Sequence, residues 1–437
     1  MATQMQTDTP TSFQDSISSN IDWSNRWTHI NKVLNRRGPF CDESFAPGQG
    51  KNSLDTCKIL VIGAGGLGCE ILKNLALSGF KNIHVIDMDT IDVSNLNRQF
   101  LFRPSDVGRP KAIVAAEFVM KRVAGVTVTP YHGKIQDKDA DYYSQFQIVI
   151  CGLDSVEARR WMNATIVEIS RENEEVIPLI DGGTEGFKGQ ARVIIPTLTS
   201  CYECSLDMLN KPTTFPICTI ANTPRLPEHC IEWAYVLEWP KAFPEQKLDT
   251  DEPQHIQWVY ETANTRAKQF NITGVTYTLT QGVVKNIIPA IASTNAIVAA
   301  ACCNEAFKLA TTTAPYLNNY MMYTGNEGIY TYTFEHQKKP ECPVCSDENN
   351  PVSVEVKKNM TLEEFIDWLK EKPDAQLKKP SLSTASKKLY LQAPPFLEKS
   401  TRPNLEKKLR DLVEEGEEIV ITDTTLPFSL RLLVNYL

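Results

Sequence analysis

The sequence predicts an α/β protein: a Rossmann-like, mainly parallel sheet, an inserted and mainly helical module, and a small C-terminal α+β domain. Apolar runs alternate with stretches of helical periodicity over residues 58–151. The sequence becomes proline-rich after residue 204. A polar linker near residue 347 precedes a further segment with both helix and strand signals. Alternating strands and helices specify a parallel sheet with helices on both faces, and 437 residues are enough for several hydrophobic cores.

The first unit begins with a strand, a tight turn and a helix. Residues 58–62 (KILVI) are an apolar run that ends at a glycine cluster, and residues 69–77 have helical spacing until Ser78-Gly79 stops them. The unit is predicted to continue with strands at residues 83–86, 126–130 and 148–151 and with a helix at residues 111–123.

The C-terminal segment carries its own helix and strand signals. Residues 361–364 (TLEE) form a capping box, and the apolar residues that follow line one helical face: Leu362, Phe365, Ile366 and Leu369. Residues 387–392 and 417–423 are typical of strands, and residues 404–412 are predicted to be helical. The predicted division is an N-terminal tail and helix (1–50), an α/β domain in two parts (51–204 and 281–346), the inserted module (205–280) and the C-terminal domain (350–437).

Charge and apolar patterning exclude several function classes. The net charge is −8 and no long Lys/Arg run occurs, so non-specific binding to nucleic acid is not expected. The polar N-terminus has no signal-peptide core. The stretch 287–303 is interrupted by Pro289 and polar residues, which favours a buried helix after Ser293 over a membrane span. We therefore expect a soluble protein of the cytoplasm, the nucleus or both, with proteins and nucleotides as partners.

A glycine-rich turn after the first strand predicts a nucleotide site. Its glycines allow close approach of a phosphate to the backbone at a helix N-terminus: Gly63, Gly65, Gly66 and Gly68. Glycines that serve only a tight turn would give the same pattern. Asp87 ends the second strand 24 residues after Gly63, where a carboxylate can accept hydrogen bonds from a ribose.

The residues beyond Asp87 separate an ATP site from a dinucleotide site. Arg98 and Lys111 follow the second strand and could bind a triphosphate, whereas an NAD-dependent dehydrogenase has no need of them. A surface cation and an ordinary helix start are their alternative roles. Asp154 follows the fourth strand and suits Mg²⁺, with a helix N-cap as a second role.

Two CxxC pairs predict a metal site. Cys201 and Cys204 form one pair, and Cys342 and Cys345 form the other. Four thiolates at this spacing fit a structural Zn²⁺ ion that joins distant segments, and two redox-active pairs are the alternative. Cys218 lies outside both pairs, in PICTIANTP, and a lone cysteine is by itself more often a core residue.

Taken together, these motifs resemble the adenylation domain of the enzymes that activate ubiquitin-like proteins and of their bacterial sulfur-carrier relatives (ThiF and MoeB type). They are GAGGLG, DMD, NLNRQF, GRPKA and the strand end at Asp154. The resemblance implies that ATP and Mg²⁺ bind and assigns nucleotide contacts to these residues: Asp87, Asp89, Asn95, Arg98, Gln99, Lys111 and Asp154. It also implies paired zinc cysteines.

The segment around Cys218 resembles the signature PxCTxxxxP of the thioester-forming cysteine in this family. The implied chemistry adenylates the C-terminal carboxylate of the modifier with ATP and then transfers the acyl group to the Cys218 thiol. Cys230 is the nearest competitor but lacks the motif. No base for Cys218 is evident in the sequence.

Four stretches resemble the branch of the family that activates modifiers of the Nedd/Rub type: residues 84–104, 179–194, 218–233 and 330–335. The branch implies a second, non-catalytic and pseudo-symmetric subunit, selection of the modifier by Arg192, and a ubiquitin-fold domain over residues 350–437 that recruits a conjugating enzyme. The alternatives are a SUMO-activating subunit, a sulfur-carrier adenylyltransferase and a pseudo-enzyme scaffold. The last would lack the glycines, Asp154 or the cysteine.

Overall fold

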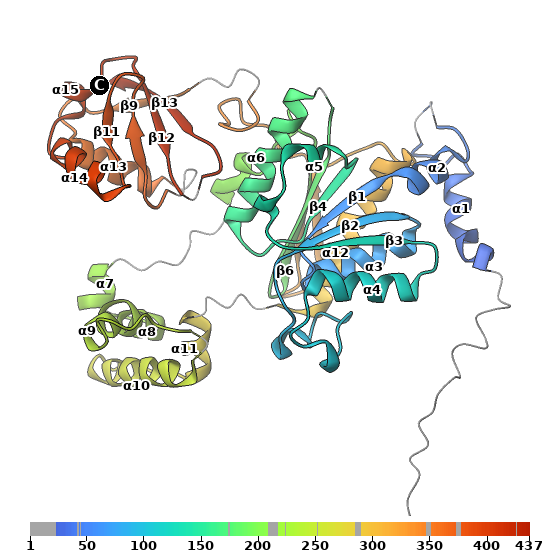
Figure 1. The fold of residues 1–437 in the computed structure, drawn as a ribbon, viewed down its shortest axis with the longest axis horizontal. Coiled ribbons are helices and arrows are strands. Elements are labelled where there is room, and N and C mark those ends of the chain that lie inside the picture. Colours follow the sequence, from blue (N-terminus) through green and yellow to red (C-terminus); the bar gives the residue numbers. More distant parts are fainter. Residues whose placement is uncertain are drawn as a thin grey trace, which may run out of the picture.

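The computed structural model describes residues 23–437 except for 42, 44, 174, 209–216, 223, 251, 285–289, 347–350, 373–376 and 425. Three packed units are visible in Figure 1: an α/β unit, a helical unit of α7 to α11, and a C-terminal unit. The N-terminal elements that precede the first strand are η1 (Trp23–Trp27), α1 (Thr28–Leu34) and α2 (Gln49–Thr56).

The α/β unit is built on an eight-stranded sheet of order β3-β2-β1-β4-β5-β6-β7-β8. The pairs among the first five strands are parallel, which confirms the predicted Rossmann-like sheet, and β6, β7 and β8 extend it in antiparallel fashion. The strands are β1 (Lys58–Ile62), β2 (Asn82–Asp87), β3 (Thr127–His132), β4 (Ile148–Cys151), β5 (Leu179–Glu185), β6 (Lys188–Ile194), β7 (Tyr320–Thr324) and β8 (Tyr330–Phe334).

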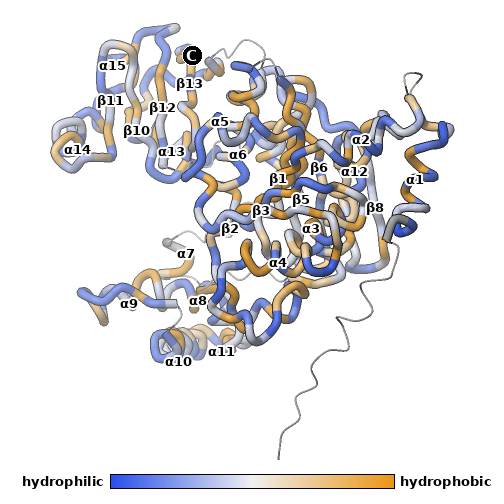
Figure 2. Tube along the Cα trace, turned by 45° about the vertical axis from the view of Figure 1, so that its right-hand side comes forward, coloured by the Kyte–Doolittle hydropathy of each residue, from blue (hydrophilic) through white to orange (hydrophobic). Residues whose placement is uncertain are grey.

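Helices cover both faces of this sheet because its central strands are hydrophobic along their length (Figure 2) and bury side chains on both faces. On β1, Ile59 and Val61 face one core with α3, α4 and α12, and Leu60 and Ile62 face the other core with α5 and α6. The helical segments of the unit are α3 (Gly66–Ser78), η2 (Val93–Asn95), η3 (Pro104–Asp106), α4 (Lys111–Arg122), η4 (Ile135–Asp137), α5 (Ala140–Ser144), α6 (Val156–Glu172), η5 (Glu203–Met208) and α12 (Ala292–Thr311).

The buried helix expected after Ser293 is present. Helix α12 begins at Ala292 and packs Val298, Cys302 and Ala306 into the core with α3. Among the described residues, no helix is long and apolar enough to cross a membrane.

The inserted module is helical, as predicted, and has a separate core around Cys230, Trp239 and Val259. Packed residues of this core continue to Val284, beyond the expected end at residue 280. Its helices are α7 (Ile217–Asn222), α8 (Pro227–Trp233), the π-helix η6 (Ala234–Glu238), α9 (Trp239–Ala242), α10 (Pro253–Gln269) and α11 (Tyr277–Val284).

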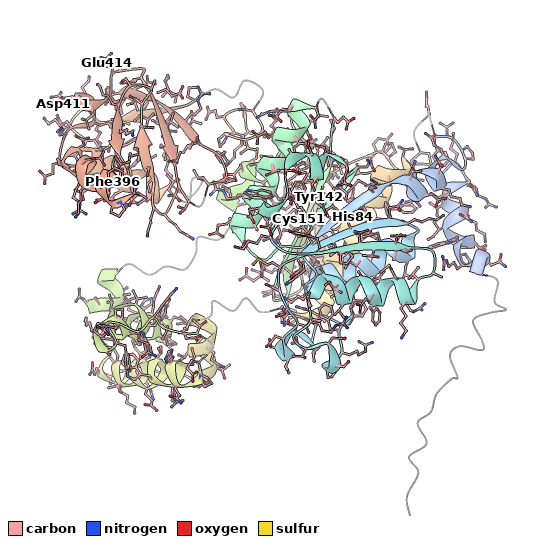
Figure 3. The ribbon with its side chains drawn as sticks, in the orientation of Figure 1. His84, Tyr142, Cys151, Phe396, Asp411 and Glu414 are labelled. Carbon is pink, nitrogen blue, oxygen red and sulfur yellow. The ribbon has the colours of Figure 1, made fainter. Side chains whose placement is uncertain are left out.

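The C-terminal unit has a five-stranded sheet of order β11-β10-β12-β13-β9. Its outward side chains include Phe396, Asp411 and Glu414, whereas Cys151 and His84 lie in the α/β unit (Figure 3). The elements are β9 (Val352–Val356), α13 (Leu362–Glu371), β10 (Ser381–Ser383), β11 (Lys388–Tyr390), α14 (Pro395–Thr401), η7 (Arg402–Asn404), α15 (Leu409–Leu412), β12 (Glu418–Thr422) and β13 (Leu430–Tyr436).

Two local predictions for this unit have different outcomes. The capping box is confirmed, because Thr361 accepts from the Glu364 amide and Glu364 accepts from the Thr361 amide. The prediction of a continuous helix over residues 404–412 is wrong. The carbonyls of Leu405 and Lys407 instead accept hydrogen bonds from the first amides of α13, so tertiary pairing replaces a helical turn.

Candidate active site

The glycine loop between β1 and α3 is held in close backbone contact with the end of β4. Gly63 has φ +95°, and a Cβ built on it would lie 2.6 Å from the Gly152 carbonyl oxygen. A Cβ on Gly68 would lie 1.9 Å from the Gly63 carbonyl oxygen. Gly65 is the N-cap of α3 and offers no side chain to the first amides of the helix. These amides are therefore available to an anion.

Asp87 ties the end of β2 to this loop. Its carboxylate accepts hydrogen bonds from the Ala64 amide at 2.6 Å and from the Asp89 amide at 2.7 Å. Burial raises the pKa of Asp87, and these two amide bonds oppose that shift. The carboxylate retains lone pairs for the hydroxyls of a ribose, the role expected from its position in the sequence.

The two predicted phosphate-binding cations are near the loop and have different surroundings. Lys111 Nζ lies 2.8 Å from Asp89 Oδ2, with a Lys111 side chain only 9% exposed. Arg98 donates to the Ser94 carbonyl at 3.1 Å, and its Cγ lies 3.4 Å from where a Cβ on Gly66 would be. Arg98 thus borders the loop, and Asp87 and Asp89 link the loop to Lys111.

Gln99 and Asn95, which the resemblance placed near the phosphates, differ in their hydrogen bonding. Gln99 is 3% exposed, and its buried Oε1 has no hydrogen-bond partner within the described part of the chain. Its Nε2 lies 3.9 Å from where a Cβ on Gly65 would be. The Asn95 side chain accepts from the Asp92 amide at 3.0 Å and so shapes the turn before Arg98.

Asp154 lies exposed after β4, next to the strand end that contacts Gly63. The alternative role as a helix N-cap belongs to Ser155, whose hydroxyl accepts from the Ala158 amide at 3.1 Å. The Asp154 carboxylate is therefore not used to cap α6. An exposed carboxylate at the edge where nucleotides bind has the donor chemistry that Mg²⁺ prefers.

Asn295 and Thr184 also border the glycine loop, and the sequence analysis missed both. A Cβ on Gly66 would lie 2.5 Å from Asn295 Nδ2. The Asn295 side chain is held by the Thr184 hydroxyl, which donates to it at 2.7 Å across 111 positions of sequence. No local motif indicates them, because α12 reaches the loop only through the tertiary fold.

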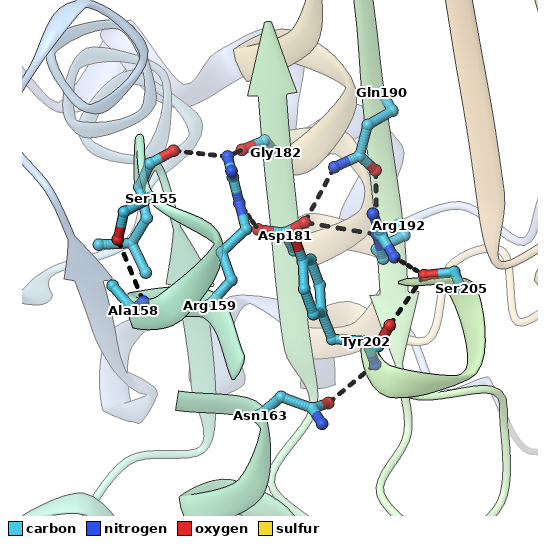
Figure 4. A network of polar contacts seen from close by, with 11 residues as sticks. Ser155, Ala158, Arg159, Asn163, Asp181, Gly182, Gln190, Arg192, Tyr202 and Ser205 are labelled. Carbon is cyan, nitrogen blue, oxygen red and sulfur yellow. Dashed lines mark hydrogen bonds and ion pairs between the residues drawn. The ribbon is translucent and has the colours of Figure 1, made fainter. Parts of the chain in front are cut away.

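Arg192 belongs to a buried polar network at the end of the parallel part of the sheet (Figure 4). It is 4% exposed, which excludes the alternative of a strand-surface cation. Its Nε lies 3.3 Å from Asp181 Oδ2, and Arg159 Nε lies 2.8 Å from Asp181 Oδ1. Tyr202 lies under the Arg192 guanidinium, 4.7 Å away. Two cations therefore share the Asp181 carboxylate.

The two CxxC pairs converge on one buried point. The Sγ atoms of Cys201 and Cys342 lie 3.5 Å apart, those of Cys204 and Cys345 lie 3.4 Å apart, and all four lie within 4.8 Å of one another. These separations are too long for disulfides. Zn–S bonds of about 2.3 Å in a tetrahedron place sulfurs about 3.8 Å apart, so the four thiols fit Zn²⁺.

Cys218 is the second residue of α7, and its side chain lies outside the described atoms. The competitor Cys230 is fully buried in the module core, and burial raises the pKa of its thiol. A raised thiol pKa lowers the thiolate fraction, which is the nucleophilic form. Cys230 is therefore poorly suited to attack an acyl group.

The fold and the loop define a member of the ThiF family, whose model matches residues 43–344, and an E2 binding domain matches residues 355–434. A NEDD8-activating enzyme E1 catalytic subunit from Dictyostelium discoideum is 54% identical, over 97% of this chain and 99% of its own length. The Drosophila melanogaster subunit of that name is 49% identical, over 94% and 95%. The chain belongs to the family of NEDD8-activating enzyme E1 catalytic subunits.

The resemblance to a SUMO-activating subunit is more limited. SUMO-activating enzyme subunit 2 from Dictyostelium discoideum is 46% identical over 49% of this chain and 30% of its own length. The two relatives named for NEDD8 cover 97% and 94% of this chain. This difference in coverage favours the Nedd/Rub branch over the SUMO alternative.

Proposed function

We propose that this chain activates a ubiquitin-like modifier of the NEDD8 type in two steps. It adenylates the C-terminal carboxylate of the modifier with ATP, forms a thioester on Cys218, and passes the acyl group to a conjugating enzyme. The observation that carries the proposal is the continuous contact from the glycine loop through Asp87 and Asp89 to Lys111, with Arg98 beside it.

In the first step, the modifier carboxylate attacks the α-phosphorus of ATP. A bond forms from the carboxylate oxygen to phosphorus, the bond to pyrophosphate breaks, and an acyl-adenylate results. Asp87 is suited to hold the ribose, and the free amides at the start of α3 lie where phosphate oxygens can be bound. Arg98 and Lys111 offset the negative charge that develops on the phosphates.

Gln99 supports a nucleotide role through its unpartnered oxygen. The Gln99 amide reaches the glycine loop at Gly65 through its Nε2. Its buried Oε1, without a hydrogen bond among the described residues, costs about 1–3 kcal/mol. A ligand donor such as an adenine amino group or a ribose hydroxyl would satisfy it. Asp154 would hold Mg²⁺, which supplies charge neutralisation between phosphate oxygens when bound.

In the second step, the Cys218 thiolate attacks the carbonyl carbon of the acyl-adenylate, and AMP leaves with the electrons of the broken C–O bond. Cys218 is on the helical module and the nucleotide loop is on the α/β unit. The reacting atoms must approach to about 3–3.5 Å, so the two units must bring Cys218 to the acyl-adenylate for this step.

Zn²⁺ is proposed as a structural ion at the four cysteines, joining the segment before the insertion to the end of the α/β unit. A second, pseudo-symmetric subunit is proposed as partner, and the C-terminal unit is proposed to recruit the conjugating enzyme. We place the activity in the cytoplasm, the nucleus or both.

Arg192 is proposed to select the modifier through charge. Because Arg159 and Arg192 share Asp181, the cluster carries an excess positive charge that disfavours an arginine in an incoming tail. Burial of Arg192 limits direct contact, so its effect would be electrostatic. In Arg192→Gln, the discrimination against a modifier whose tail carries arginine is expected to become weaker. If the preference between modifiers in pyrophosphate exchange stayed the same, this role of Arg192 would be removed.

The proposed function is tested by ATP–pyrophosphate exchange in the chain with its partner subunit. Exchange is expected with a NEDD8-type modifier and not without a modifier, and Asp154→Asn should reduce it by about 10- to 1000-fold. Equal exchange with SUMO would redirect the assignment, and absence of exchange with every modifier would overturn it.

A further inference from the structure

A buried arginine of the helical module reaches the short helix that carries Cys218. Arg266, on α10, donates from Nη2 to the Ile220 carbonyl at 2.9 Å and also to the Ala221 carbonyl. Both acceptors lie in the last turn of α7, 46 and 45 residues away in sequence. The side chain therefore joins two helices through the backbone of α7.

Helix α7 needs such support because it has only six residues. Isolated helices shorter than about 12 residues are marginal in water, and the last four carbonyls of any helix lack partners within the helix. Two of these carbonyls are satisfied by Arg266. The Ile220 side chain, 1% exposed, supplies an apolar attachment to the module in the same turn.

The Arg266 guanidinium is itself held in a defined position. It is 8% exposed, and its central carbon lies 4.0 Å from the ring centre of Trp233 and 5.0 Å from that of Phe270. A planar guanidinium stacks on aromatic rings and donates in its own plane, whereas a lysine ammonium provides only a point charge. The geometry is specific to arginine.

We propose that Arg266 is a positioning residue for the thioester step: it fixes the turn of α7 next to Cys218 and so sets where the sulfur is presented. This inference rests on the proposed role of Cys218. At about 1.5 Å of rise per residue, Ile220 and Ala221 are only about 3–5 Å along the helix axis from Cys218. An anchor at that distance limits displacement of the Cys218 backbone to a fraction of a turn.

The expected consequence is confined to the second chemical step. The nucleotide loop is on a different unit, so loss of Arg266 should leave adenylation unchanged. Transfer to Cys218 should slow, because a displacement of about 1 Å at a reacting atom can reduce a rate by about 100-fold.

The test uses the chain with its partner subunit and compares Arg266→Gln, Arg266→Lys and Lys268→Gln. Lys268 is exposed on the same turn of α10 and is the matched loss of a cation. Pyrophosphate exchange reports adenylation, and single-turnover transfer from preformed adenylate reports the thioester step. Arg266→Gln is expected to transfer about 10- to 100-fold more slowly, Arg266→Lys to recover part of that rate, and Lys268→Gln to match the wild type.

Limited proteolysis of the module separates positioning from unfolding. The proposal requires that Arg266→Lys keep wild-type resistance while its transfer rate lies between those of the wild type and Arg266→Gln. Transfer at the wild-type rate in Arg266→Gln would overturn the proposal, as would a rate loss matched by loss of resistance in both variants. Thioester formation in Cys218→Ala would instead overturn the proposed function on which it rests.

Discussion

The Lys111 ammonium lies 2.8 Å from the Asp89 carboxylate and is almost buried, so the cation is already paired before any nucleotide binds. A bound phosphate must therefore share Lys111 with Asp89 or displace Asp89 from it. We expect Lys111→Met to lower kcat/KM for pyrophosphate exchange by about 100- to 1000-fold, since a buried cation at a phosphate stabilises the transition state strongly. Asp89→Asn, which keeps Lys111 in place, should lower kcat/KM for pyrophosphate exchange by less than about tenfold. A Lys111→Met variant within twofold of the wild type would remove Lys111 from the site.

The glycine loop gives a paired prediction about steric room. Gly66→Ala should raise the KM for ATP, because its Cβ would approach Asn295 Nδ2, with a cost of about 1–3 kcal/mol. Adding Asn295→Ala should restore part of the affinity. Gly68→Ala should not be rescued, because its Cβ would meet the backbone oxygen of Gly63. Equal behaviour of the two alanine variants in the Asn295→Ala background would contradict this geometry.

The four-cysteine cluster predicts one zinc ion per chain. Elemental analysis should find it in the wild type and not in Cys345→Ser, whose free energy of unfolding should fall by several kcal/mol. Cys41→Ser, outside the cluster and only partly buried, is the matched control and should retain the ion. A metal-free wild type with the same unfolding midpoint as Cys345→Ser would exclude a structural zinc ion at these cysteines.

The buried ion pair of Arg160 and Glu203 predicts a pH-dependent defect. The Nε–Oε1 distance is 2.7 Å, and both side chains are at most 2% exposed. Burial raises the pKa of Glu203 even with Arg160 present. In Arg160→Met the charge that opposes this shift is lost and the pKa of Glu203 rises further, so near neutral pH the folded state loses up to about 3–5 kcal/mol of stability, whether Glu203 stays protonated or ionises unpaired.

The sign of this effect follows from the raised pKa. Because the folded-state pKa of Glu203 lies above its unfolded-state value, the penalty is absent only below the unfolded-state pKa of about 4.3 and grows as the pH rises toward the folded-state pKa. Arg160→Met should therefore be less destabilised in urea at pH 5 than at pH 7.5. Adding Glu203→Gln should remove the pH dependence. A destabilisation that is equal at both pH values would show that the lost charge partner is not its cause.

The local parts of the fold were predictable because adjacent residues determine them. The apolar runs gave β1 and β4 with the observed limits, and the Thr361 capping box marked the start of α13. Strand β5 and the antiparallel extension beyond it were not predicted. β5 contains Gly182 and Gly183, and β8 is mostly exposed, so neither has the apolar alternation that identifies a strand.

The residues of the candidate site also divide into those that local sequence patterns indicate and those that only the tertiary fold brings together. Glycine spacing, strand ends and CxxC pairs are local patterns, and they indicated the loop, Asp87 and the cysteines. The contacts of Asn295 with Gly66 and of Arg266 with α7 depend on helices that approach from distant sequence. The N-cap of α6 is Ser155 and not its neighbour Asp154, a difference of one residue that the sequence pattern did not decide.

The central claim is that one nucleotide loop makes an acyl-adenylate that one sulfur then captures. It is tested most directly by following labelled AMP and thioester in a single turnover of Cys218→Ala and Cys230→Ala beside the wild type. The account predicts that Cys218→Ala makes adenylate in wild-type amount and no thioester, and that Cys230→Ala makes both. Thioester on Cys218→Ala, or its loss only in Cys230→Ala, would contradict it.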